Sequence, residues 1–515
     1  MRSLREFQIL NNYKIEYNIS AKIYIETVTD LVMFPKDFKF GFSESGFQFE
    51  MGISEPDTNT DWYSWSHNGY NITHKIVSGD LPENGPGYWD LYSTDHANAK
   101  RLGMNAGRIG IEWSRIFQKS TEGVKVDTQI ENGDVVHIEI TDKDVEKLDE
   151  LANKKNVEHY RKIFSDFKSR NNFLIINLYH WSTPLWINDP SKKDIEKDNA
   201  IGNGFNTRSI VEFSKFAAYI AYNFDDLADR WSTMNEPNIV FGTQSSTDRS
   251  PDSVAIREKY FTEAHARAYD SIRQYSNKPV GVIYANSDMQ PLDSQDKDVI
   301  AEAEYAERFS FFDAIKNGNM KWFTDAALRK DIEAGDENRK DMAGKLDWVG
   351  VNYYSRVVLK QDNGTWIPVP GYGHYCDHLS KSLDGRSVSD FGWEVYPEGI
   401  YNVIMSYKKN VGVPIIISEN GIADDSDALR PRYLVSHLKN IDRAIRDGAR
   451  VEGYLHWGLT DNYEWAAGFS QRFGLMRVDF KTKKRYLRPS ALVFREIATS
   501  FEIPEEMNWL SEDKF

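Results

Sequence analysis

The sequence predicts an α/β protein, a (β/α)8 TIM barrel formed by a single domain with insertions. Short apolar runs alternate with charged, helix-like stretches, which is typical of parallel strands joined by helices. Eight such runs are present, the number that a closed barrel of this kind needs. No linker rich in Pro, Gly or Ser divides the 515 residues. The runs are Phe38–Phe42, Asn105–Gly110, Leu174–Leu178, Arg230–Met234, Val280–Tyr284, Leu346–Val351, Ile415–Ser418 and Gly453–His456.

The segment after the seventh run illustrates the predicted helices. Apolar residues recur there at intervals of 4, 3 and 4 positions, which places them on one helical face. These residues are Leu434, Leu438, Ile441 and Ile445. Pro431 suits the first turn of this helix, and Gly448 suits its end.

Two segments stand apart from the repeating pattern. Residues 1–32 show no clear period, and we expect either a disordered extension or a start site placed too early, since Met33 opens the barrel-like segment. Residues 118–156 are charged and alternate at Val135–Ile140, which predicts an inserted hairpin away from the chemistry. The expected division is an extension at 1–32, a catalytic barrel at 33–500 and a tail at 501–515.

Composition excludes several classes of function. The formal net charge of −15 argues against nucleic acid as a partner. The single cysteine, Cys376, permits neither an internal disulfide nor a cysteine-based metal site. No apolar run is long enough to cross a membrane, and the first thirty residues lack the apolar block of a signal peptide. We therefore predict a cytoplasmic protein without membrane association, metal or cofactor.

Two glutamates stand where a barrel enzyme places its chemistry. Glu236 directly follows the fourth run, in Asn-Glu-Pro, and Glu419 follows the seventh, in Ser-Glu-Asn-Gly. In this fold, residues just beyond the carboxyl ends of the strands face the active site. Hydrolysis of a glycosidic bond needs two carboxyl groups, one to protonate the leaving oxygen and one to attack carbon or to activate water. A lone glutamate would more often be a helix cap or a surface group, but a pair at two strand ends favours a glycosidase.

These two motifs resemble the signatures of glycoside hydrolase family 1, and the resemblance runs from about Phe34 to Arg488. It is closest to the archaeal β-glycosidases of that family, β-glucosidase and β-galactosidase. The resemblance implies that Glu236 is the acid/base, that Glu419 is the nucleophile and that configuration is retained. It also implies a homo-oligomer, either a dimer or a tetramer.

Further positions match the family and carry implied roles. Arg108, Asn235 and Tyr354 are expected to support the two glutamates, with Asn235 also binding the 2-hydroxyl of the sugar. The expected substrate-binding residues are Gln48, His180, Trp181, Asn235, Trp393, Trp457, Glu464 and Trp465. Taken singly, His180 or Trp393 would more often be structural, so these assignments depend on the motifs.

Glu464 and Glu236 narrow the class of substrate that we expect, and Ser182 departs from the family pattern. Members that cleave 6-phosphorylated sugars replace the residue equivalent to Glu464, because a carboxylate would repel the phosphate. Thioglucosidases lack the acid/base that Glu236 provides. A β-linked oligosaccharide, or an aryl or alkyl glycoside, of a neutral sugar is therefore the expected substrate. Many members have Asp where this chain has Ser182.

Other functions remain open at this point. Acceptor sugars could outcompete water, which would make transglycosylation the main activity. A barrel that binds sugar without cleaving it is a second alternative, although such homologues lose one or both glutamates. A Schiff-base lysine enzyme is disfavoured, because no lysine stands at a strand end. The sequence does not rank glucose, galactose and fucose.

Overall fold

The computed structural model describes residues 32–192, 205–244, 251–293, 297–323, 333–362, 365–378 and 380–511. Most of the predicted 1–32 extension and residues 512–515 of the predicted tail lie outside these ranges.

Eight parallel strands close into a barrel, as predicted. They follow one another around the sheet in the order β2-β3-β6-β7-β8-β11-β13-β14, and β14 pairs with β2 to close the ring. The strands are β2 Lys39–Ser43, β3 Ala106–Gly110, β6 Phe173–Asn177, β7 Arg230–Asn235, β8 Val280–Pro291, β11 Trp348–Asp362, β13 Ile415–Asn420 and β14 Val451–His456. All eight predicted runs are confirmed as barrel strands.

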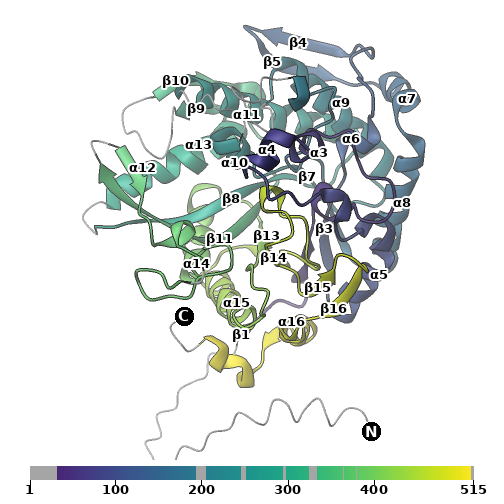
Figure 1. Cartoon of the computed structure of the whole chain (residues 1–515). Coiled ribbons are helices and arrows are strands. Elements are labelled where there is room, and N and C mark those ends of the chain that lie inside the picture. The colour runs from purple at the N-terminus through teal and green to yellow at the C-terminus, as the bar shows by residue number, and fades with distance from the viewer. Residues whose placement is uncertain are drawn as a thin grey trace, which may run out of the picture. The chain divides into compact units, whose positions relative to one another are not determined.

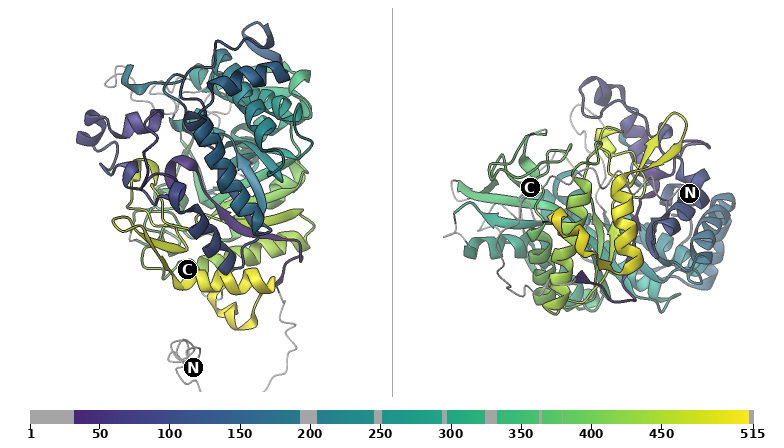
Figure 2. Two further views of the ribbon diagram at one scale, coloured as in Figure 1. Left: turned by 90° about the vertical axis from the view of Figure 1, so that its right-hand side faces the viewer. Right: turned by 90° about the horizontal axis from the view of Figure 1, so that it is seen from below.

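One long helix follows each barrel strand and lies on the outside of the barrel (Figure 1). These helices are α5 Tyr88–Arg101, α8 Lys154–Ser169, α9 Thr207–Phe224, α11 Pro251–Arg273, α13 Ser310–Asn317, α14 Glu398–Asn410, α15 Arg430–Arg446 and α16 Pro489–Ser500. Helix α15 has Pro431 in its first turn, and Gly448 beyond its end has a φ of 85°, as its sequence predicts. The last two helices pack side by side, in yellow-green and yellow in Figure 2.

Strands β8 and β11 run well past the barrel and are longer than the predicted fifth and sixth runs. Their outer halves stay paired with each other, and β11 also pairs with β12 Thr365–Pro368. Polar residues interrupt both apolar runs, at Asn286–Asp288 in β8 and at Ser355–Arg356 in β11, so the apolar pattern alone could not reveal the outer halves.

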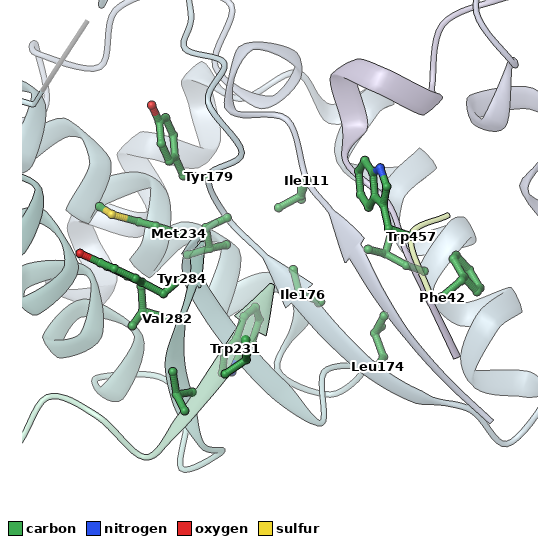
Figure 3. Packing of buried hydrophobic residues seen from close by; sticks show 14 of the residues in the cluster. Phe42, Ile111, Leu174, Ile176, Tyr179, Trp231, Met234, Val282, Tyr284 and Trp457 are labelled. Atoms are coloured by element: carbon green, nitrogen blue, oxygen red, sulfur yellow. The ribbon is translucent and has the colours of Figure 1, made fainter. Parts of the chain in front are cut away.

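The core forms two layers that follow the alternation of side chains along each strand. One layer fills the barrel interior with Ala106, Ile175, Ile283, Trp348, Ile416 and Leu455. Their neighbours in sequence point outward and pack against the helices. Figure 3 shows part of this outer layer, including Leu174, Ile176, Trp231 and Val282. The barrel interior is therefore packed below the site.

Shorter elements surround the barrel. The helices and turns are α2 Gly46–Phe49, α3 Asp61–Ser66, α4 Gly69–Thr73, η2 Pro82–Asn84, α6 Trp113–Ile116, α7 Asp142–Leu151, η3 Pro190–Lys192, α10 Pro237–Ile239, η4 Val240–Gln244, α12 Lys297–Glu304, η6 Tyr305–Phe309, η7 Lys340–Met342, η8 Gly373–Tyr375, η9 Trp465–Ala467 and η10 Glu505–Ser511. The strands are β1 Val32–Met33, β4 Asp127–Glu131, β5 Asp134–Glu139, β9 Asn319–Phe323, β10 Glu333–Asn338, β15 Met476–Asp479, β16 Lys484–Leu487 and β17 Glu502–Ile503. Strands β4 and β5 form the predicted hairpin, and β1 pairs with β17.

Candidate active site

The two glutamates lie where the regular strand ladders are interrupted. The pairing of β13 shifts register between Ile417 and Asn420, around Glu419. The pairing of β7 shifts between Ser232 and Asn235, just before Glu236. Such irregularities break the strict alternation of side chains and can turn a residue toward a site.

Glu419 is held by two charge-assisted hydrogen bonds. Arg108, on β3, donates from Nη2 to Oε1 of Glu419 at 2.7 Å. The Tyr354 hydroxyl donates to Oε2 at 2.7 Å. Burial raises the pKa of Tyr354 well above its ordinary value, so this hydroxyl remains a donor. Both oxygens of a carboxylate that is only 4% exposed are thus fixed in place.

Glu236 has the environment of a carboxylic acid that keeps its proton. Burial is the main cause that raises its pKa to about 8, and the negative charge of Glu419 raises it further. A hydrogen bond from Asn352 Nδ2 to Oε1, at 2.8 Å, and the charge of Arg108 act in the opposite direction. Glu236 also has a φ of 49°, in the left-handed region that non-glycine residues rarely adopt.

Asn235 links the residues that bind the two glutamates to a histidine. Its Oδ1 accepts from Arg108 Nη1 at 2.5 Å and from Asn352 Nδ2 at 3.0 Å. Its Nδ2 lies 3.1 Å from Nε2 of His180. An amide donor at Nε2 makes that ring nitrogen the acceptor, which leaves the proton of the neutral ring on Nδ1. Burial lowers the pKa of His180 well below its ordinary value and so favours this neutral ring.

Glu464 and Gln48 form a second polar group. Gln48 Nε2 donates to Oε2 of Glu464 at 3.3 Å, and Asn462 Nδ2 donates to the same oxygen at 2.9 Å. Burial raises the pKa of Glu464 to about 7, although the hydrogen bond from Asn462 lowers it. Ser45 Oγ holds the other end of the Gln48 side chain by donating to its Oε1 at 2.8 Å.

Stacked aromatic rings surround these polar groups. The rings of Trp181 and Trp465 stack with centroids 4.8 Å apart, and Phe47 stacks on Trp465 at 5.5 Å. The rings of His180 and Trp457 lie nearly parallel at 6.0 Å. Flat, buried faces of this kind suit the C–H faces of a sugar ring.

Trp393 lies beside Tyr354, the tyrosine that binds Glu419. Its ring centroid is 5.2 Å from that of Tyr354 and 4.4 Å from that of Phe391, on which it stacks. Trp457, in contrast, contacts the second polar group through a hydrogen bond to Glu464.

These contacts link the residues that were singled out from the sequence into one site. Sequence reasoning missed Asn352, which touches Glu236 and Asn235, and Ser418, whose Oγ donates to Asn352 Oδ1 at 2.7 Å. Both follow apolar positions at the ends of barrel strands, a signal that could have identified them. Nδ1 of His180 and Nε1 of Trp181 are buried without a hydrogen-bond partner among the described residues, and so could donate to a ligand.

The described residues include neither a metal-binding cluster nor a membrane-spanning helix. No group of three His, Cys, Asp or Glu side chains among them is arranged to hold a metal ion. None of the described helices combines the length and the apolar character needed to cross a bilayer.

Comparison with known proteins agrees with this geometry. The sequence profile of glycosyl hydrolase family 1 matches residues 31–131 and 149–503, and the gap lies within the predicted insertion. A β-galactosidase of Saccharolobus solfataricus is 47% identical over 93% of this chain and 97% of its own length.

Solved structures give the same result. The β-glycosidase of Thermosphaera aggregans has a TM-score of 0.86 and 46% identity, over 93% of this chain and 99% of its own. The β-glucosidase of Pyrococcus furiosus has a TM-score of 0.84 and 46% identity, over 93% of this chain and 98% of its own. The chain belongs to glycosyl hydrolase family 1.

Proposed function

We propose that this protein hydrolyses terminal, non-reducing β-D-glucosides and β-D-galactosides with retention of configuration, using Glu419 as nucleophile and Glu236 as acid/base. The supporting observation is the contrast between the two carboxyls. Glu419 is bound through both oxygens to Arg108 and Tyr354, whereas the pKa of Glu236 is raised to about 8. Two nearby carboxyl groups whose environments differ in this way can divide the roles of nucleophile and acid.

In the first step, a Glu419 oxygen attacks the anomeric carbon and the bond to the leaving oxygen breaks. Glu236 gives its proton to that oxygen, so the aglycone leaves as an alcohol. The product is a glycosyl ester of Glu419. Arg108 and Tyr354 hold the attacking carboxylate, which limits the orientations it must search.

In the second step, Glu236 is ionised and takes a proton from water, whose oxygen attacks the anomeric carbon. The ester bond to Glu419 breaks, and the sugar leaves with its original configuration. Esterification removes the negative charge of Glu419, one of the causes that raise the pKa of Glu236. The pKa of Glu236 therefore falls in the intermediate, as a group that turns from acid into base requires.

The sugar preference is proposed from the polar group around Glu464. A carboxylate that already accepts bonds from Gln48 and Asn462 suits sugar hydroxyls and repels a phosphate. Relatives described as β-galactosidase and β-glucosidase occur among the matches, which supports both sugars as substrates.

The decisive experiment uses Glu419→Gly with 4-nitrophenyl β-glucoside and β-galactoside, with and without azide. We expect the variant to be inactive, and azide to restore nitrophenol release with α-glycosyl azide as product. A fully active variant, or one that azide does not rescue, would contradict the assignment of Glu419. The wild-type rates on the two substrates rank the sugars. The ratio of transfer products to free sugar at high substrate concentration measures transglycosylation.

We also propose that the chain is cytoplasmic and self-associates as a dimer or tetramer. The support for assembly is a 46% identical β-glucosidase mutant described as derived from a hyperthermophilic tetrameric structure. Light scattering coupled to size-exclusion chromatography tests the assembly, and a mass equal to one chain would contradict it.

A further inference from the structure

Glu112 is a buried carboxyl group next to the sugar site, with no role in the two chemical steps. It lies just beyond β3, at the N-cap position of the short helix α6, and it is 5% exposed. Burial is the main cause that raises its pKa to about 8, and the charge of Glu50 raises it further. Because a polar group is costly to bury without hydrogen bonds, its partners indicate its use.

The first partner is the helix α2, which carries Gln48. The backbone N–H of Phe47 donates to Oε1 of Glu112 at 2.9 Å. The two segments are in close contact, because a Cβ added at Gly46 would lie 2.5 Å from Cγ of Glu112. Glycine at position 46 permits this approach, so Glu112 fixes the backbone next to Gln48.

The second partner is the loop after β6, which carries His180 and Trp181. Ser182 Oγ donates to Oε2 of Glu112 at 2.5 Å. Trp181 has a φ of 73°, a left-handed conformation that needs support from its surroundings. The neighbouring Thr183 is anchored separately, by donating its N–H and hydroxyl to Asp61. Glu112 is therefore the contact that joins this loop to α2.

We propose that Glu112 is a positioning residue for the sugar, which sets the spacing between Gln48 on one side and His180 with Trp181 on the other. Each oxygen of its carboxyl group holds one of the two segments. This inference rests on the proposed function, because it assumes that these segments bind the sugar.

The contact between Glu112 and Ser182 supplies a sharp test, because the carboxyl group and the hydroxyl can be exchanged between the two positions. We expect Glu112→Ser and Ser182→Asp each to harm sugar binding, the first by removing the carboxyl group and the second by burying two carboxyl groups together. The double variant should restore one carboxyl group and one hydroxyl.

The measurements are the dissociation constant of D-glucose by calorimetry, and KM and kcat for 4-nitrophenyl β-glucoside. We expect Glu112→Ser to weaken glucose binding and raise KM about tenfold, with a smaller loss in kcat, since two hydrogen bonds are lost. The exchange variant should recover most of this loss. If Glu112→Ser does not fold, Ser182→Ala, which removes only the bond between Glu112 and the loop, is measured instead, with the same expected direction.

The matched control is Glu212→Gln, on helix α9. Glu212 is 3% exposed and also has two partners, Thr121 and Lys215, but it contacts none of the sugar-site residues named above. We expect this variant to lower the melting temperature without changing glucose binding. Unchanged glucose binding in Glu112→Ser, or an exchange variant no better than Glu112→Ser, would overturn the inference. A wild type that binds glucose but hydrolyses nothing would instead refute the proposed function.

Discussion

The hydroxyl of Tyr354 offers a quantitative test of how the nucleophile is held. Its bond to Glu419 is 2.7 Å long, half-buried, and made to a carboxylate. Hydrogen bonds to charged groups contribute about 1.5–3 kcal/mol. If Tyr354→Phe removes this amount of stabilisation from the transition state, kcat/KM falls about 10- to 150-fold, since each 1.36 kcal/mol of activation free energy is a factor of ten in rate. Arg108 still binds the other oxygen, so activity is reduced and not abolished.

The assay is kcat/KM for 4-nitrophenyl β-glucoside, because this constant reports the step in which Glu419 attacks. Phenylalanine keeps the ring and its contact with Trp393, so the loss reports the hydroxyl alone. Tyr353→Phe is the matched control. Tyr353 is the buried neighbour in sequence, and its hydroxyl donates to the backbone oxygen of Tyr396 at 2.6 Å.

We expect Tyr353→Phe to lower the melting temperature while kcat/KM stays within about twofold of wild type. The reasoning is refuted if Tyr354→Phe retains wild-type kcat/KM. It is also refuted if both variants lose activity equally, because the effect would then come from general packing and not from the carboxylate.

Three further predictions follow from the site. The pKa of Glu236 is raised to about 8, so kcat/KM should fall as the pH rises through about 8, where the acid gives up its proton. The residual kcat/KM of Glu236→Gln should not show this fall, and an unchanged fall in the variant would assign it to another group. Glu464→Gln should cut kcat/KM by about 100-fold or more on both sugars, since its amide oxygen would accept from Gln48 and Asn462 and its NH2 would replace the oxygen left to accept from sugar hydroxyls; loss on only one sugar would contradict a shared role. Trp393→Ala should raise KM for 4-nitrophenyl β-glucoside but not for β-glucosyl fluoride, whose leaving group is a single atom, and equal effects would place Trp393 on the sugar side.

Most of the barrel could be predicted from the sequence because its strands are buried on both faces. Such strands are continuous apolar runs, and segments such as Ile415–Ser418 stand out from the charged helices around them. The outer halves of β8 and β11 were missed because their stability comes from pairing with each other and with β12. Pairing between segments that are far apart in the sequence leaves no pattern in either segment alone.

The site was predicted through its motifs, but its internal connections were not. Family resemblance gave expected roles to Arg108 and Tyr354, and the structure adds that they bind different oxygens of Glu419. Asn352 was overlooked although it follows the apolar run Leu346–Val351, because its role depends on bonds to Glu236 and Asn235, which come from another part of the chain. The shifts in strand register beside the glutamates are likewise set by neighbouring strands and not by local sequence.

The pairing of β14 with β2 has a consequence for synthesis of the protein on the ribosome. The first barrel strand, Lys39–Ser43, finds one of its two neighbours only when Val451–His456 has been made. A growing chain that has passed Glu236 still lacks Glu419, Glu464 and the strand that closes the ring. Until then, one edge of its first strand stays unpaired, and unpaired strand edges promote aggregation in partly folded chains. Catalytic activity therefore appears only near the end of translation, and hydrolysis of a chromogenic glycoside can serve as a reporter of complete synthesis.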